Sequence, residues 1–352
     1  MPGVHPDNQS RRYSRPVPLR LRAISEQPEG DRGTAYPPAR FLVKPKSSIQ
    51  LLARLLSRRL FIGTGLAGAI ISTASRGSQA SAQEARVDGN RVISKDGTRI
   101  AFDRSGDGPP LILVGGALSD RSGGAPLVEL LAPRFTVFSY DRRGRGDSED
   151  TSPYAVEREI EDLEALIDEA GGAAFVHGQS SGAVLSLEAT AKFPAKVRKL
   201  SLYEPPFIID DSRPPPPENF VGQINKLIAA NRRGDAVEFW MTEVVRAPAE
   251  AVAEMRRAPT WPALEAVAHT LPYDVAVLGD NMAGNPLPTD QWAAATASTL
   301  VMDGGASPAW IRNSARALAN VLANAQHRTL EGQTHDAAPE VLAPKIERFF
   351  VG

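Results

Sequence analysis

The sequence contains no cysteine and carries almost no net charge, with 40 Lys and Arg against 41 Asp and Glu among 352 residues. Without a thiol, the chain can form no disulfide, thiolate metal site or iron–sulfur cluster, and it cannot use a cysteine nucleophile. Apolar residues make up 42% and charged residues 23%. This composition is typical of globular proteins rather than of disordered, collagenous or membrane-embedded chains.

The low net charge hides an asymmetry between two parts of the chain. Residues 1–82 contain 13 basic and 4 acidic side chains, whereas the remaining 270 residues contain 27 basic and 37 acidic ones. A nucleic-acid surface would have to be basic and to lie on the later, folded part. Because that part is acidic, we expect no nucleic-acid partner.

Residues 1–82 have the layout of an export signal. Residues 1–56 are rich in Arg, Pro and Ser, residues 60–75 carry no charge, and Ala-Ser-Ala follows at 80–82. A basic segment, a short apolar segment and small residues at a cleavage site are typical of a secretory signal. The arginine pair at 58–59 resembles that of twin-arginine signals. We therefore expect the twin-arginine translocase as a partner during export, and a periplasmic or secreted location.

The uncharged segment at 60–75 does not predict a stable membrane anchor. Its 16 residues include Gly, Ser and Thr, and a membrane-spanning helix needs roughly 20 apolar residues. The alternative interpretation of this segment is an amphipathic or anchoring helix.

The chain after residue 82 predicts one large α/β domain with an insertion. Over residues 83–212, short apolar runs that suit buried strands alternate four times with segments of helical period. This alternation indicates a parallel sheet with right-handed crossovers. It stops at the proline run 214–217, and residues 213–298 have a helical pattern without a clear strand. Because the alternation resumes over 299–352, we predict a helical insertion between two parts of one α/β core.

The sharpest chemical signal is Gly-Gln-Ser-Ser-Gly at 178–182, between a predicted strand and a predicted helix. A Ser on such a turn is held in a strained conformation with its Oγ exposed, and the flanking glycines avoid collisions with neighbouring backbone. The helix N-terminus supplies a backbone N–H, here that of Ser181, which can stabilise a developing oxyanion. We therefore predict that Ser180 is a nucleophile.

With this motif the chain resembles the α/β-hydrolase family over essentially all of residues 90–352. Val-Gly-Gly-Ala at 114–117 resembles the family's oxyanion loop, with Gly115 in place of the usual His. Tyr-Asp-Arg-Arg-Gly-Arg-Gly-Asp-Ser at 140–148 is similar to the loop after the family's fourth strand. That loop is structural in the family, so we assign no chemistry to it.

The resemblance implies an α/β-hydrolase fold, in which helices flank a mostly parallel sheet and a helical cap is inserted. It also implies an oxyanion hole formed by the backbone N–H groups of Ala117 and Ser181. It implies neither a metal nor an organic cofactor.

A serine hydroxyl needs a base that accepts its proton, and we predict His335 for this role. His335 directly follows the last predicted strand, which is where the resemblance places the general base. The alternative is a helix-capping or surface histidine. The other four histidines are His5 in the leader, His177 on the strand before the nucleophile, His269 in the insertion and His327 at the start of a strand.

The acid that orients the base departs from the family pattern, because its usual position falls on Ser307. Serine carries no charge that could stabilise an imidazolium. Two carboxylates could replace it: Asp303, four residues earlier, and Glu204, which ends the strand after the nucleophile helix. We favour Glu204, because some dehalogenases and lactone hydrolases of this fold are similar in placing their acid there. The alternative roles for Glu204 are a cap hinge and a substrate contact.

Together these residues predict the cleavage of a small-molecule carboxylic ester or lactone through an acyl-enzyme on Ser180. Aromatic residues of the insertion suggest an apolar roof over the pocket: Phe239, Trp240, Trp261, Tyr273 and Trp292. A cofactor-free perhydrolase or a C–C bond hydrolase would fit the same residues. Since Ser307 replaces the usual acid, the alternative from another class is a hydrolase-like protein that binds a small ligand without turnover.

Overall fold

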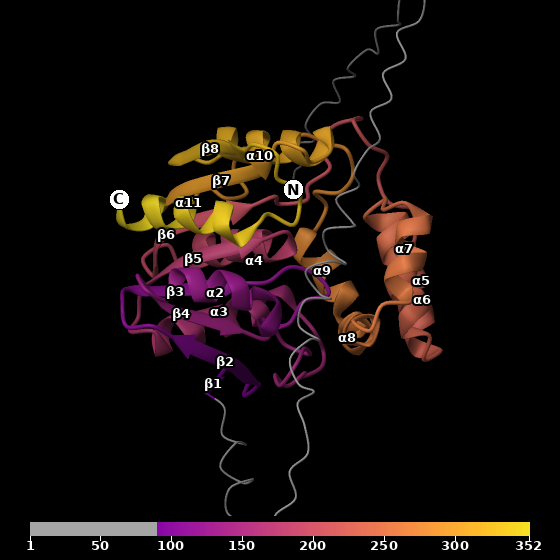
Figure 1. Cartoon of the computed structure of the whole chain (residues 1–352), viewed down its shortest axis with the longest axis horizontal. Helices are drawn as coiled ribbons and strands as arrows, with labels where there is room; N and C mark the ends of the chain where they lie inside the picture. The colour runs from indigo at the N-terminus through magenta and orange to yellow at the C-terminus, as the bar shows by residue number, and fades with distance from the viewer. Residues whose placement is uncertain (1–89) are drawn as a thin grey trace, which may run out of the picture. The chain divides into compact units, whose positions relative to one another are not determined.

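An eight-stranded sheet organises residues 90–352, the part of the chain that the computed structural model describes (Figure 1). The predicted export segment, residues 1–82, lies outside the described residues. The strand order across the sheet is β1-β2-β4-β3-β5-β6-β7-β8. The strands are β1 (Arg91–Ile93), β2 (Arg99–Ser105), β3 (Pro110–Val114), β4 (Thr136–Tyr140), β5 (Ala174–Gln179), β6 (Val197–Tyr203), β7 (Ser298–Gly304) and β8 (Ala325–Leu330).

The sheet is mostly parallel, which confirms the prediction from the alternation of strands and helices. β1 pairs with β2 and β2 pairs with β4 in the antiparallel sense, and each remaining neighbour pair is parallel. Parallel neighbours need long crossover connections, which are usually helical. The carboxyl ends of β3, β5, β6, β7 and β8 therefore lie at one edge of the sheet.

Helices cover both faces of the sheet. Along β3, Leu111 and Leu113 join the apolar cluster of α2 and α11, whereas Ile112 and Val114 join the cluster of α3, α4 and α10. This alternation follows from the two-residue period of a strand, which sends successive side chains to opposite faces. The core helices are η2 (Arg121–Gly124), α2 (Ala125–Leu131), α3 (Val156–Glu169), α4 (Ser181–Lys192), α10 (Ala309–Val321) and α11 (Pro339–Val351).

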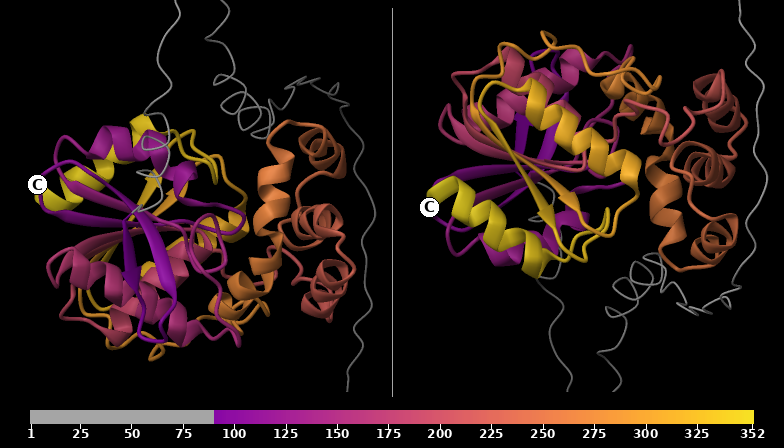
Figure 2. Two further views of the ribbon diagram at one scale, coloured as in Figure 1. Left: turned by 90° about the horizontal axis from the view of Figure 1, so that it is seen from below. Right: turned by 90° about the horizontal axis from the view of Figure 1, so that it is seen from above.

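A helical cap is inserted between β6 and β7, as the resemblance implied, and it forms a layer beside the core (Figure 2). Its helices share an apolar cluster of their own, which also includes Leu118 from the loop after β3. The cap helices are α5 (Phe220–Ala229), α6 (Arg233–Phe239), the π-helix η3 (Trp240–Val244), α7 (Ala249–Arg256), α8 (Trp261–Val267), η4 (Ala268–Thr270) and α9 (Leu271–Leu278). Each of the helices described in residues 90–352 is too short or too polar to span a bilayer.

The helical part of the insertion is shorter than the segment 213–298 that the sequence predicts. Residues 279–297 contain no helix, and part of this stretch packs on the core instead of the cap. Trp292 stacks on Phe207 with the ring centroids 5.4 Å apart, and its Nε1 donates a hydrogen bond to Glu188 Oε1 at 2.7 Å. Trp292 is therefore a core residue and does not belong to the roof that we expected.

Three other aromatic residues expected in the pocket roof are also used for packing. Trp240 and Trp261 are buried inside the apolar cluster of the cap. Tyr273 stacks on Tyr154, with the ring centroids 3.9 Å apart. A helical period shows which residues are apolar neighbours, but it does not show whether they face a ligand or one another.

We expect Leu163→Ala to lower the free energy of unfolding by about 2–5 kcal/mol, because it leaves a cavity in a closely packed core. Leu163 lies on α3 and is 0% exposed. Leu130→Ala on α2 is the control, since Leu130 is 41% exposed and such changes cost about 0.5 kcal/mol or less. Urea unfolding of the full chain measures both changes, and equal losses would contradict this assignment of the core.

Candidate active site

Ser180 lies on the sharp turn between β5 and α4, in the strained conformation that its motif predicts. Its backbone has φ 55° and ψ −127°, which is unusual for a residue with a side chain. The flanking glycines are required sterically. A Cβ on Gly178 would lie 2.7 Å from Ala183 Cα, and one on Gly182 would lie 2.5 Å from Gly115 O. The turn therefore depends on two close backbone contacts.

The loop after β3 lies directly against Ser180. A Cβ on Gly116 would be 2.9 Å from the Cβ of Ser180. The next residue, Ala117, packs against the apolar cluster of the cap. This loop, which we predicted to contribute to the oxyanion hole, thus lies between the candidate nucleophile and the cap.

His335 is held in the loop after β8 by contacts with two neighbouring strands. Gln179 Nε2, next to Ser180 in sequence, donates a hydrogen bond to His335 O at 2.9 Å. The imidazole Nδ1 of His335 lies 2.7 Å from Glu204 Oε2. Glu204 is completely buried, and its other carboxylate oxygen accepts a hydrogen bond from Gly304 N at 2.7 Å. The structure thus brings His335 and Glu204 into direct contact.

Neither the other candidate acid, Asp303, nor Ser307 at the family's usual acid position forms a hydrogen bond with His335. The Oδ2 of Asp303 lies 2.7 Å from Nε2 of a different histidine, His327. The hydroxyl of Ser307 is buried and has no hydrogen-bond partner among the described residues. Of these candidates, Glu204 is therefore the carboxylate that is paired with His335.

The surroundings of His335 favour its protonated form. Burial disfavours the imidazolium, but the hydrogen bond to Glu204 and the charges of Glu204 and Asp336 outweigh burial and raise the pKa of His335 above its ordinary value. His177 shows the opposite behaviour. Burial lowers its pKa to about 4, and its Nδ1 lies 3.0 Å from Ser201 Oγ, as expected for a histidine of the core.

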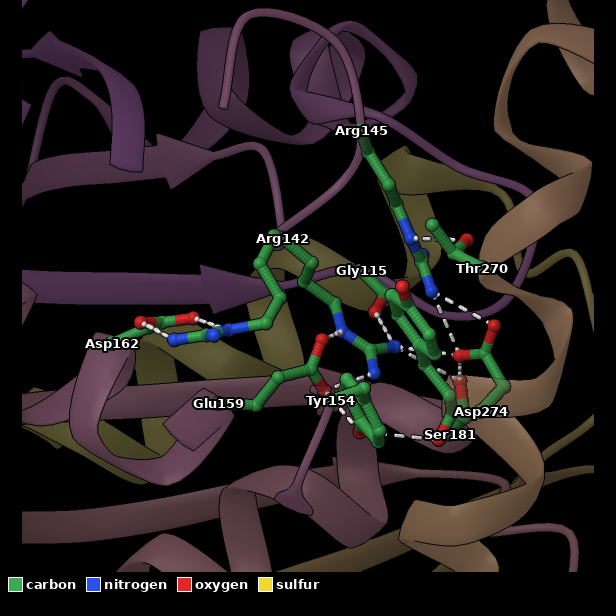
Figure 3. Close-up of polar contacts among 12 residues, drawn as sticks. Gly115, Arg142, Arg145, Tyr154, Glu159, Asp162, Ser181, Thr270 and Asp274 are labelled. Carbon is green, nitrogen blue, oxygen red and sulfur yellow. Dashed lines mark hydrogen bonds and ion pairs between the residues drawn. The ribbon is translucent and has the colours of Figure 1, made fainter. Parts of the chain in front are cut away.

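A buried network of charges lies beside the nucleophile turn and was not expected from the sequence (Figure 3). Asp274 on α9 of the cap pairs with Arg142 and Arg145 from the loop after β4, with N–O distances of 2.7 and 2.8 Å. The Ser181 hydroxyl donates to Asp274 Oδ1 at 2.7 Å. The only signal in the sequence is that Asp274 is a lone acid on an otherwise apolar helix. In the described residues, no group of three or more His, Asp and Glu side chains could hold a metal ion.

From the sequence we expected the loop that includes Arg142 and Arg145 to be only structural, but it contacts the backbone next to the candidate site. Arg145 Nη1 donates to Gly116 O at 2.6 Å, and Arg142 Nη1 lies 3.5 Å from Gly115 O. Burial disfavours the charge on Asp274, but the two arginines outweigh burial and lower the pKa of this carboxyl below its ordinary value. The two arginines therefore favour the ionised form of Asp274.

Proton NMR of the His335 ring tests the pairing with Glu204. In the native protein we expect His335 to titrate above the ordinary histidine pKa of about 6.5. Glu204→Gln removes the negative charge that stabilises the imidazolium, so the pKa should fall and the neutral form should appear at lower pH. Asp303→Asn is the control, because Asp303 pairs with His327. A shift caused by Asp303→Asn but not by Glu204→Gln would contradict the pairing.

Comparisons with known proteins place these features in a family. The model of the alpha/beta hydrolase family matches residues 111–344. An alpha/beta hydrolase from Sphaerobacter thermophilus is 60% identical, with a TM-score of 0.70, over 74% of this chain and 100% of that chain. A thermophilic esterase from Thermogutta terrifontis shares the fold at 23% identity and a TM-score of 0.55, over 74% of this chain and 97% of that chain.

A curated relative matches a shorter segment. The uncharacterized hydrolase YraK of Bacillus subtilis is 32% identical over 120 residues, which is 33% of this chain and 44% of that protein. The chain thus covers less than half the length of this relative. Together with the eight-stranded sheet and the inserted helices, the family match and the solved structures confirm the predicted fold.

Proposed function

The chain belongs to the alpha/beta hydrolase family, and from this premise we propose that it is a serine hydrolase. Its substrate is a carboxylic ester or lactone of a small, apolar molecule, and the reaction passes through an acyl-enzyme on Ser180. The observation that carries the proposal is the contact of 2.7 Å between His335 Nδ1 and the buried Glu204. His335 lies in a loop whose backbone accepts a hydrogen bond from Gln179, the residue before Ser180. An imidazole that is paired with a carboxylate, in a loop tied to the turn of a strained serine, suits the activation of that serine's hydroxyl.

In the first half of the reaction, the serine attacks the substrate. Because Glu204 accepts a hydrogen bond from the Nδ1–H of His335, the other ring nitrogen is left to take the proton from Ser180 Oγ. A bond then forms between Oγ and the carbonyl carbon, and the negative charge on the carbonyl oxygen is stabilised by the N–H groups of Ala117 and Ser181. When the bond to the leaving oxygen breaks, His335 returns its proton to that oxygen.

In the second half, water releases the acid. His335 removes a proton from water, which attacks the acyl carbon, and the proton is then passed to Ser180 Oγ as the acid departs. The raised pKa of His335 suits both halves, because the imidazolium that forms in each half is stabilised by Glu204. Each turnover consumes one ester and one water and needs no redox partner.

Support for an ester or lactone comes from the type of site. A serine nucleophile with an oxyanion hole suits acyl transfer, and the thermophilic esterase that shares this fold acts by name on esters. The apolar character of the substrate is inferred from the sequence, because the inserted segment is rich in apolar residues. The alternative of a binding protein without turnover rests on Ser307, but Glu204 now occupies the position beside the imidazole.

We expect a fluorophosphonate probe to label Ser180 in the folded full-length protein and to leave Ser180→Ala unlabelled, because the probe reacts with an activated serine hydroxyl. Mass spectrometry of the labelled peptide identifies the site. Glu204→Gln should slow this labelling strongly. In a separate assay, the rate at which Glu204→Gln hydrolyses a nitrophenyl ester should fall on the order of 10⁴-fold. Asp303→Asn serves as the matched loss of a buried carboxylate and should retain the wild-type rate.

Two results would decide against this proposal. If folded protein does not label and no ester, lactone or amide of a substrate panel turns over, the binding-protein alternative stands. If Asp303→Asn abolishes activity while Glu204→Gln does not, the acid assignment is wrong.

We further propose that residues 1–82 direct the hydrolase through the twin-arginine translocase to the periplasm or the medium. The support is the arginine pair at 58–59, the uncharged segment and the Ala-Ser-Ala sequence. Replacing Arg58 and Arg59 with Lys should leave the protein inside the cell, because twin-arginine signals are recognised through this pair. Fractionation of a bacterial host followed by immunoblotting measures the effect, and unchanged export would refute the proposal.

A further inference from the structure

We propose that Asp274, on the cap helix α9, is a positioning residue that orients both N–H donors of the oxyanion hole. The inference rests on the proposed function, because that function assigns the two donors to Ala117 and Ser181. Asp274 contacts Arg145, which binds the peptide that carries the Ala117 N–H, and it also contacts the hydroxyl of Ser181 (Figure 3). One carboxylate on the cap therefore acts on the geometry of a site in the core.

The first path runs through Arg145 to the donor of Ala117. Arg145 Nη2 donates to both carboxylate oxygens of Asp274, at 2.9 and 2.8 Å, and Arg145 Nη1 donates to Gly116 O at 2.6 Å. The carbonyl of Gly116 and the N–H of Ala117 belong to one planar trans peptide, so they point in opposite directions. Ser119 Oγ also donates to Gly116 O, at 2.7 Å. By holding this carbonyl together with Ser119, Arg145 helps to fix the direction of the Ala117 N–H.

The second path runs directly to Ser181. Its hydroxyl donates to Asp274 Oδ1 at 2.7 Å and accepts from Arg142 Nη1 at 3.3 Å. Ser181 is the first residue of α4, directly after the candidate nucleophile. These two contacts hold the residue whose backbone N–H is the second proposed donor.

Burial makes this arrangement sensitive to the charge on Asp274. Asp274, Arg142 and Arg145 are at most 2% exposed, and buried charges interact more strongly than charges in water. Arg142 has a second carboxylate partner in Glu159, whereas among residues 90–352 Arg145 pairs with Asp274 alone. Loss of the charge would leave Arg145 without a counter-ion, held only by its hydrogen bonds to Thr270 Oγ1, Ser119 O and Gly116 O. Its hold on Gly116 O would therefore weaken.

The test compares Asp274→Asn with Asp162→Asn in the full-length protein. Asp162 is equally buried and accepts two hydrogen bonds from Arg143, at 2.8 and 2.7 Å. Arg143, however, donates its other hydrogen bonds to Asp96 and to the backbone of Arg158, away from the oxyanion loop. Asp162→Asn therefore removes a comparable buried charge without touching the proposed donors.

We expect Asp274→Asn to lower kcat for a nitrophenyl ester by about 10- to 100-fold with KM nearly unchanged, because the donors act mainly in the transition state. Inhibition by an alkyl boronic acid, which mimics the tetrahedral intermediate on Ser180, should weaken by a similar factor. Asp162→Asn should leave kcat, KM and boronic-acid inhibition at the wild-type values. Unfolding in urea separates a loss of stability from these effects.

The inference is overturned if Asp274→Asn keeps wild-type kcat and boronic-acid inhibition, or if it raises KM alone. If Asp274→Asn does not fold, Ser181→Ala decides the question, because it removes a single hydroxyl of the second path. Ser181→Ala should reduce kcat and boronic-acid affinity in parallel, and wild-type values of both would refute the inference. Failure of the proposed function looks different: the wild-type protein itself would neither label nor hydrolyse the ester.

Discussion

The close approach of three backbone segments at the end of β5 is the constraint on which the site depends. Gly178 and Gly182 have no space for a Cβ, because the first turn of α4 and the end of β3 lie too near. At this contact Ser180 has a positive φ, and the loop after β3 lies against it. The strained turn at the candidate nucleophile Ser180 and the adjoining loop after β3 thus depend on the same close packing, and larger side chains at these glycines would disturb both.

Buried charge links the cap to this constraint. Two arginines and two acids, Arg142, Arg145, Glu159 and Asp274, balance in charge and are almost completely buried. Such a network is costly to desolvate and need not stabilise the fold more than apolar packing would. Its contacts with the backbone of Gly115 and Gly116 and with Ser181 suggest another role, since they give the polar groups around the site a single arrangement.

The parallel register explains how Glu204, the candidate acid, reaches His335 from the end of β6. Tyr203 on β6 pairs with Met302 on β7, so Glu204 and Asp303 are the next residues on adjacent strands. The backbone of Glu204 has φ 48°. Its carboxylate contacts His335, whereas the carboxylate of Asp303 contacts His327 on β8. Two buried carboxylates at neighbouring strand ends are thereby divided between two histidines.

Much of the fold and the individual candidates could be read from the sequence, because they depend on local patterns. Apolar runs and helical periods predicted the parallel sheet and the inserted cap, and the glycines around Ser180 predicted its turn. Glu204 could be favoured over Asp303 as the partner of His335 only through the family resemblance, because the two residues are 131 positions apart. The partners of Asp274 could not be predicted, since Arg145 lies 129 positions away in the chain. Burial of Trp292 in the core was missed for the same reason: periodicity identifies an apolar face, but only the packed chain determines what that face contacts.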